Sequence, residues 1–413
     1  MLPTVPVPPK HLDDYVETAG EEAVERLREA AKPLTGLRLL QLNSTAYGGG
    51  VAELLHTQVA LLQDLGIDTT WAILEGSDGY FAVTKAVHNA LQGAEVDWTP
   101  EMASTYWERI VANAAELPDG YDVYLVHDPQ PAALIRVLEE EERRRGTWLW
   151  RCHIDLSTPH APVWDFFEPI VNRYDAAIFT MEDFAQPGVS GPELAFIPPS
   201  IDPLSTKNCP VSWETIREVL TSFGVDPERP IVSQVSRFDP WKDPLGVIDT
   251  HRLISEAVPE VQLVMIASLA HDDPEGMRYL DLTDEHRAGD PDVHLLTNLD
   301  GVDNLQVNAF QRASDVIVQK STREGFGLVV AEGMWKDKPV VGGNVGGIRL
   351  QVAEGETWYL VDSIETCAAR VVELLGDPDL RERMGKAGHE RVRERFLSLR
   401  ELEDYLRLIA RVA

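Results

Sequence analysis

The sequence contains few cysteines, and their spacing fits neither a disulfide framework nor a metal site. Cys152, Cys209 and Cys367 are the only three in 413 residues; they are far apart and odd in number. No Cys-x-x-Cys and no cysteine–histidine pair at zinc spacing is present. We therefore expect reduced thiols, no metal ligands and a cytoplasmic location.

Long apolar runs are also missing. No uncharged apolar stretch reaches the ~18 residues that a spanning helix needs, and the first twenty residues lack a basic segment followed by an apolar core. We therefore expect neither a secretory signal nor a membrane partner.

Positive charge is scarce. The 37 Lys and Arg residues stand against 68 Asp and Glu, which gives a net charge of −31, and only nine residues are lysine. So acidic a chain is a poor general partner for nucleic acid or an anionic membrane. Any anion must be held by a local site, and a lysine within a motif is therefore notable.

Apolar strands and helices alternate along the chain, and the alternation occurs twice. A chain that is 44% hydrophobic and this long can fill two cores. This pattern predicts two doubly wound Rossmann-like α/β domains with parallel sheets facing a central cleft. The expected strands are 37–44, 68–74, 121–130, 147–157, 175–180 and 193–202, then 227–243, 261–268, 293–300, 314–321, 338–347 and 357–363.

The Pro-rich stretch 197–210 is the expected seam between the domains. We predict an N-terminal acceptor-binding domain over residues 1–205 and a C-terminal nucleotide-sugar-binding domain over 206–385. A helical segment, 386–413, follows; it either returns to the first domain or forms a dimer contact.

Polar residues gather where the predicted strands end. Ligands of open parallel sheets bind beyond the carboxyl ends of the strands, so these residues are site candidates. From the first half they are Gly48, Gly49, Gly50, His127, Asp128, His153 and Asp155; from the second half they are Arg237, Lys242, Asn298, Glu324, Gly346 and Gly347.

The stretch "REGFGLVVAE", residues 323–332, joins a predicted strand to a predicted helix that starts at Leu328. Gly325 and Gly327 lie in the turn, and the bare N–H groups of a helix start favour an anion. Two acids, Glu324 and Glu332, stand eight residues apart.

Each of these features also has a purely structural interpretation. The three glycines can form a plain tight turn, and Arg237 and Lys242 can be surface charges. Glu332 can lie on a solvated helix face, and Glu324 can pair with its neighbour Arg323. Trp148 and Trp150 are expected in the core.

The spacing of Glu324 and Glu332, with "SRFDPWKD" before it and "GGNVGGI" after it, resembles the retaining glycosyltransferases of family 4, which have the GT-B fold. The words "YGGGVAELLH", "WRCHIDLSTP", "IPPSIDPLS", "AHDDPEG" and "LLTNLDGV" narrow the resemblance to the trehalose glycosyltransferring synthases. The matched words span roughly residues 40 to 360. Fungal-type trehalose phosphorylases share much of the pattern.

The resemblance implies a role for each candidate. Arg237 and Lys242 hold the donor diphosphate together with the N–H groups of Leu328 and Val329, Glu324 binds the transferred glucose, and Glu332 binds the ribose. His127 is the implied active-site histidine near the donor sugar, and His153 and Asp155 bind the acceptor. The remaining implied donor-binding positions are Gly49, Gly50, Asn298, Gly325, Phe326 and Gly327.

The reaction that the resemblance implies is transfer of glucose, with retention, from a nucleoside-diphosphate glucose to D-glucose, which gives α,α-trehalose. A front-face route is expected, in which the leaving phosphate oxygen helps to take the acceptor's proton. No cofactor is required; Mg²⁺ is compatible with this chemistry but is not indicated by any residue pattern.

Three alternatives stay open: a trehalose phosphorylase, a nucleotide-sugar 2-epimerase and a non-catalytic sugar-nucleotide sensor. The preferred base, the direction of the reaction and a homodimeric state are also open.

Overall fold

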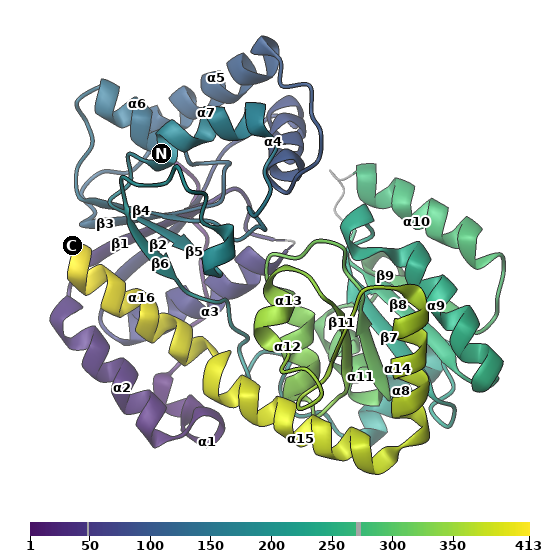
Figure 1. Cartoon of the computed structure of the whole chain (residues 1–413). Helices are drawn as coiled ribbons and strands as arrows, with labels where there is room; N and C mark the ends of the chain where they lie inside the picture. Colours follow the sequence, from purple (N-terminus) through teal and green to yellow (C-terminus); the bar gives the residue numbers. More distant parts are fainter. Residues whose placement is uncertain (48, 270–273) are drawn as a thin grey trace. The chain divides into compact units, whose positions relative to one another are not determined.

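The computed structural model describes residues 1–47, 49–269 and 274–413, and the chain divides into two compact units (Figure 1). Unit 1 comprises Met1–Ser200 and Ser398–Ala413, and unit 2 comprises Ile201–Leu397. Gly48 and the first four residues of "AHDDPEG" lie outside the described residues.

The second predicted domain boundary, at residue 385, is wrong. It falls inside helix α15 (Pro378–Arg395), which packs against α12 (Leu328–Trp335) and α14 (Ile364–Gly376) and therefore belongs to unit 2. Only the last helix, α16 (Ser398–Val412), belongs to unit 1, where it packs against α2 (Glu21–Ala31).

Unit 1 is built on a parallel six-stranded sheet, in the order β2-β1-β3-β4-β5-β6. The six strands predicted for the first half of the chain are confirmed. They are β1 (Arg38–Asn43), β2 (Asp68–Ile73), β3 (Val123–His127), β4 (Thr147–Arg151), β5 (Ala176–Phe179) and β6 (Glu193–Phe196).

Helices cover both faces of this sheet (Figure 1). One face carries α4 (Asp78–Leu91), α5 (Pro100–Glu116), α6 (Leu134–Glu140) and α7 (Ala161–Val171), and the other carries α3 (Gly50–Asp64) with α2 and α16; the short α1 spans Val16–Ala19. Trp148 and Trp150 lie in the core under the first group, as predicted, and Trp148 stacks on Tyr124.

Unit 2 repeats the plan, with a parallel sheet in the order β12-β11-β10-β7-β8-β9. Its strands confirm the prediction for the second half: β7 (Ile231–Ser236), β8 (Gln262–Ala267), β9 (Val293–Thr297), β10 (Val316–Gln319), β11 (Val340–Gly343) and β12 (Tyr359–Val361). Besides α12, α14 and α15, its helices are α8 (Trp213–Ser222), α9 (Pro244–Ala257), α10 (Pro274–Arg287), α11 (Asn304–Ala313) and α13 (Gly346–Gln351).

The strand orders decide where a ligand can bind in each unit. In such sheets the order reverses at one point, and the crevice at the carboxyl ends there is the usual ligand site. The reversal lies between β1 and β3 in unit 1 and between β7 and β10 in unit 2. The residues that follow these four strands are therefore the candidates for a ligand site in each unit.

None of the helices described is long and apolar enough to cross a membrane.

Candidate active site

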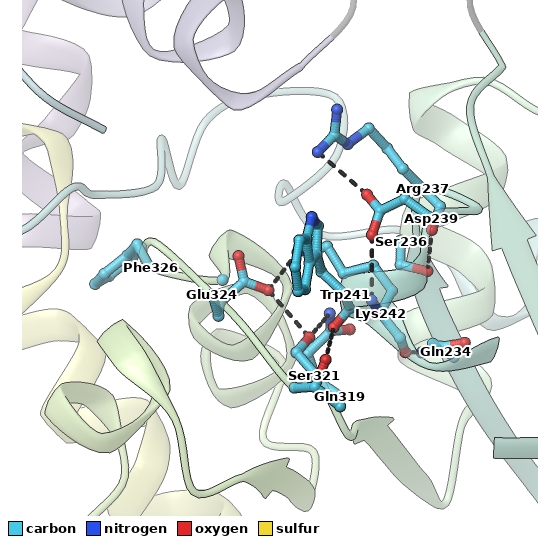
Figure 2. Close-up of polar contacts among 12 residues, drawn as sticks. Gln234, Ser236, Arg237, Asp239, Trp241, Lys242, Gln319, Ser321, Glu324 and Phe326 are labelled. Carbon is cyan, nitrogen blue, oxygen red and sulfur yellow. Dashed lines mark hydrogen bonds and ion pairs between the residues drawn. The ribbon is translucent and has the colours of Figure 1, made fainter. Parts of the chain in front are cut away.

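In unit 2, a polar cluster joins the ends of β7 and β10 (Figure 2). After β7 the chain forms a short 3-10 helix, Pro240–Lys242, which Asp239 caps by accepting from the N–H of Lys242 at 3.2 Å. The amide of Gln234 on β7 donates to the carbonyl oxygen of Lys242 at 2.8 Å. Lys242 is thus fixed to the edge of the sheet by its backbone.

The ammonium group of Lys242 pairs with the carboxylate of Glu324, which follows β10 (Figure 2). Nζ and Oε2 are 2.5 Å apart, and the two side chains are only 13% and 10% exposed. The hydroxyl of Ser321 donates to the same oxygen at 3.2 Å. The carboxylate of Glu324 therefore belongs to this cluster, and Lys242 is not a plain surface charge.

Arg237 differs from Lys242 in its exposure. Its guanidinium lies 3.2 Å from the carboxylate of Asp239, yet the side chain is 46% exposed. Both basic side chains have a carboxylate partner, but the exposed side chain of Arg237 has more room to turn to an anion than that of Lys242; such a turn would leave the buried Asp239 without its ion-pair partner.

The turn between Glu324 and α12 is held open by glycine. Gly327 has φ of +82° and directly precedes α12, where no side chain caps the helix start. Gly347 donates from its N–H to the carbonyl of Glu324 at 3.1 Å, and a Cβ on Gly347 would lie 2.4 Å from Cα of Phe326. Close backbone packing therefore requires glycine at 347, and the first N–H groups of α12, at Leu328 and Val329, have no acceptor within the helix.

Two side chains predicted to bind the donor instead contact other residues of unit 2. The ring of Phe326 is buried against Phe396, so only its backbone can face a ligand. The amide of Asn298 bonds to both backbone groups of Leu269, at 2.7 and 3.0 Å, and holds the end of β8.

Glu332, one turn into α12, is 1% exposed, so its placement on a solvated helix face is wrong. Gln311 donates to Oε2 at 2.7 Å, and Nζ of Lys207 lies 3.5 Å from Oε1. Burial raises the pKa of this carboxyl, but the charges of Lys207 and Lys336 outweigh burial and hold the pKa below its usual value.

Lys336 anchors this cluster from α12's end. Its ammonium donates to Asn208 at 2.8 Å and to Gln311 at 2.6 Å. Neither lysine is among the predicted site residues, because neither lies in a motif that the sequence analysis assigned to the site.

In unit 1, α3 starts at the switch point between β1 and β3. Gly49 has φ of +112° and caps α3, and a Cβ there would meet nothing within 4 Å. Gly49 therefore leaves the helix start open, as a backbone approach to a ligand requires, and Gly50 is the first residue of α3.

The two histidines that follow β3 and β4 are in contact. Nδ1 of His127 lies 2.9 Å from Nε2 of His153, and Nε2 of His127 lies 2.8 Å from Oε1 of Gln41 on β1. His127 is 1% exposed, whereas His153 is half-buried. The histidine that a ligand can reach is thus His153.

Two carboxylates stand beside this pair. Asp128 has φ of +64° and accepts from the N–H of His153 at 2.8 Å, and burial raises its pKa to about 6. Asp155 accepts from the N–H and the hydroxyl of Ser157, at 3.0 and 2.6 Å. Asp155, predicted to bind the acceptor, therefore also shapes its own loop.

No three histidine, cysteine, aspartate or glutamate side chains in the described ranges are grouped as metal ligands.

Known proteins resemble the chain along its whole length. Residues 41–186 match the family "Trehalose synthase, N-terminal domain", and residues 216–391 match "Glycosyl transferases group 1". The trehalose synthase of Thermococcus litoralis is 48% identical over 402 residues, 97% of either chain. That of Rubrobacter xylanophilus is 48% identical over 98% of this chain and 97% of its own.

More distant proteins match the sequence at lower identity or share the fold. The trehalose phosphorylase of Grifola frondosa is 25% identical over 91% of this chain but only 57% of its own. Among solved structures, the UDP-forming trehalose-phosphate synthase of Burkholderia xenovorans in complex with glucose-6-phosphate has a TM-score of 0.73 at 14% identity, over 90% of this chain and 100% of that one. Sucrose-phosphate synthase of Thermosynechococcus elongatus has a TM-score of 0.70 at 19% identity, over 91% and 98%.

Two doubly wound parallel sheets, the acids Glu324 and Glu332 at eight-residue spacing, and this degree of identity along the whole chain lead to one conclusion: the chain belongs to the trehalose synthase family of GT-B glycosyltransferases.

Proposed function

We propose that the chain is a retaining glucosyltransferase that moves glucose from a nucleoside-diphosphate glucose to D-glucose and so forms α,α-trehalose. The observation that carries the proposal is the buried Lys242–Glu324 pair beside the open start of α12, at the switch point of unit 2. Relatives that are 48% identical bear the name trehalose synthase.

The basic groups would receive the diphosphate. Lys242 supplies a buried point charge, Arg237 supplies a mobile fork of donors, and the N–H groups of Leu328 and Val329 supply a helix start. Charge that develops on a leaving diphosphate is stabilised by such fixed donors.

Glu324 would face the transferred glucose. Its Oε2 is bound to Lys242 and Ser321, which leaves Oε1 to accept from a sugar hydroxyl. Held by two donors, the carboxylate is oriented for hydrogen bonding rather than prepared as a nucleophile. In the step that we propose, the bond from glucose C1 to the phosphate oxygen breaks, C1 bonds to the acceptor oxygen, and the acceptor's proton passes to the leaving diphosphate.

Glu332 would bind the ribose. Its Oε1 has no hydrogen-bond partner within the described ranges and lies 3.5 Å from Nζ of Lys207. Because the carboxylate is buried, ribose hydroxyls could reach Oε1 only after the residues that cover it rearranged.

The acceptor would be held by groups of unit 1, with His153 and Asp155 as the contacts. His127 is buried, so we assign it a supporting role behind His153.

The experiment is incubation of the full chain with UDP-, ADP- or GDP-glucose and D-glucose. The expected product is a non-reducing disaccharide, formed together with one nucleoside diphosphate for each sugar transferred. A change of the donor sugar without consumption of glucose would instead indicate an epimerase. Absence of any turnover, with tight binding of the nucleotide sugar, would indicate a sensor.

A trehalose phosphorylase is the second candidate, because the Grifola frondosa relative with that name matches 91% of this chain. It would need no ribose, which fits the closed environment of Glu332. Trehalose and inorganic phosphate, without nucleotide, should give no glucose phosphate if the first proposal holds.

A further inference from the structure

A hydrogen-bonded chain of three side chains crosses the strand ends of unit 1. Gln41 on β1 contacts His127 on β3, and His127 contacts His153 after β4. The two imidazole rings are nearly parallel, 18° apart. Gln41 and His127 are buried, so of these three side chains only His153 is accessible to a ligand.

The partners fix the position of each proton. The Gln41 oxygen can only accept, so Nε2 of His127 carries a hydrogen. Burial, with the charge of Arg151, lowers the pKa of His127 to about 3, so the ring is neutral and its Nδ1 accepts. Nε2 of His153 must then be the donor in the contact between the rings.

His153 is also neutral. Burial, then the charge of Arg151 and the neighbouring His127 hold its pKa well below the usual value. With its one proton on Nε2, Nδ1 carries a lone pair. Within the described ranges no group hydrogen-bonds to this Nδ1.

Arg151 lies directly behind the pair. It is the strand partner of His127, it is fully buried, and none of its three guanidinium nitrogens hydrogen-bonds to a described group. A fixed positive charge here disfavours a second one on either ring. Besides the two histidines, the charge of Arg151 lowers the pKa of Asp128, Cys152, Glu401 and Tyr405, the last two on α16, while Asp155 acts on Cys152.

Burial raises the pKa of Glu401, and the charge of Arg151 acts against burial by lowering it. Glu401 is fully buried and accepts from the hydroxyl of Ser200, while its other oxygen has no hydrogen-bond partner among the described residues. The C-terminal helix therefore contributes to the electrostatics of the strand ends.

We propose that Gln41, His127 and Arg151 are positioning residues that hold His153 as the neutral Nε2–H tautomer, so that Nδ1 always accepts a hydrogen bond from a hydroxyl of a bound sugar. The sugar part of this inference rests on the proposed function. The tautomer part does not, so the two can fail separately.

The tautomer is tested by nitrogen NMR of the full chain labelled with ¹⁵N-histidine, with signals assigned by His127→Gln and His153→Gln. We expect both rings to show one protonated Nε2 and one bare Nδ1, unchanged from pH 5 to pH 8. A ring that takes up a second proton in this range, or a His153 with its proton on Nδ1, would overturn the proposal whatever the enzyme's activity.

The role of Gln41 is tested by a matched pair of variants. Gln41→Glu keeps an acceptor against His127, whereas Gln41→Met removes it. We expect Gln41→Met to raise KM for glucose up to about tenfold, as for one net hydrogen bond, with KM for the nucleotide sugar unchanged. Gln41→Glu keeps the acceptor and should raise the KM for glucose less than Gln41→Met, although its buried carboxylate also raises the pKa of His127. Equal glucose KM values for the two folded variants would refute the role of Gln41.

The role of Arg151 is tested by pH dependence. Arg151→Met alone would leave Glu401 uncompensated, so the double variant with Glu401→Gln is the folded reference. We expect the kcat/KM for glucose of that double variant to fall at a higher pH on acidification than that of the wild type, because loss of the Arg151 charge raises the pKa of both histidines; burial, the larger cause, still holds these pKa values below the usual range. Arg151→Lys should restore the wild-type profile. A folded double variant with the wild-type profile would overturn the role of Arg151.

Discussion

Replacement of Lys242 by alanine separates the observed pairing of this lysine with Glu324 from its proposed binding of the donor diphosphate. At 2.5 Å the attraction between the two charges is about 7 kcal/mol for an effective dielectric constant of about 20. Most of this only offsets the cost of desolvating both groups, and removal of one partner of a buried pair costs about 3–5 kcal/mol. Since both side chains keep some exposure, we expect the lower end of that range.

The variant should therefore lose about 3 kcal/mol of unfolding free energy in urea denaturation. The double variant Lys242→Ala with Glu324→Gln should recover most of that loss, because no bare carboxylate stays buried. Lys386→Ala is the matched control. Lys386 pairs with Glu382 on the surface of α15, where solvent screens the pair, so this change should leave the unfolding free energy nearly unchanged.

Activity should behave differently from stability. Loss of one fixed donor to the leaving group costs about 3–4 kcal/mol of barrier, a fall in kcat of about 10² to 10³. Both the single and the double variant should show it in initial rates with saturating nucleotide sugar and glucose. If the double variant regained wild-type kcat together with its stability, Lys242 would be a structural residue only, and the assignment to the diphosphate would be wrong.

Three further changes test other parts of the site, one of them against a control outside it. Glu332→Gln should weaken nucleoside-diphosphate binding in calorimetry more than it raises KM for glucose. The pKa of Glu332 is lowered in the folded protein, so its carboxylate stabilises the fold above about pH 4.5, and this contribution is lost as the pH falls through the folded pKa. The free energy of unfolding of Glu332→Gln should therefore fall less than that of the wild type over that acid range. Gly347→Ala should lower the free energy of unfolding by about 1–3 kcal/mol and weaken nucleotide binding, because its Cβ would meet backbone at 2.4 Å. The control Gly376→Ala, with open space around it, should leave the free energy of unfolding in urea unchanged. Asp155→Asn should raise KM for glucose with nucleotide affinity nearly unchanged; the reverse result in the same two assays would contradict its assignment to the acceptor.

Residues 323–335 illustrate what could be predicted from sequence. The turn, its glycines and a helix from Leu328 were all expected, and α12 spans Leu328–Trp335. Strands and helices show a characteristic spacing of apolar residues, and turns contain glycine, all within a few adjacent residues. These elements can therefore be predicted from a single sequence. The twelve strands were recognised for the same reason, as was the eight-residue spacing of the two acids.

Contacts between distant residues left no such local trace. Lys242 and Glu324 are 82 residues apart, and they meet because β10 pairs with β7 at the switch point. Alternation of strands and helices predicts a parallel sheet but not the order of its strands.

Burial was likewise decided only by the tertiary structure. The sequence alone identified His127 and Glu332 as polar residues near strand and helix ends. That His127 lies behind His153, held by Gln41, and that Lys207 lies beside the carboxylate of Glu332, follow from side chains brought together across 86 and 125 positions. Whether a polar group faces solvent, a ligand or another buried charge depends on the packing of elements far apart in the chain, and local residue patterns do not encode that packing.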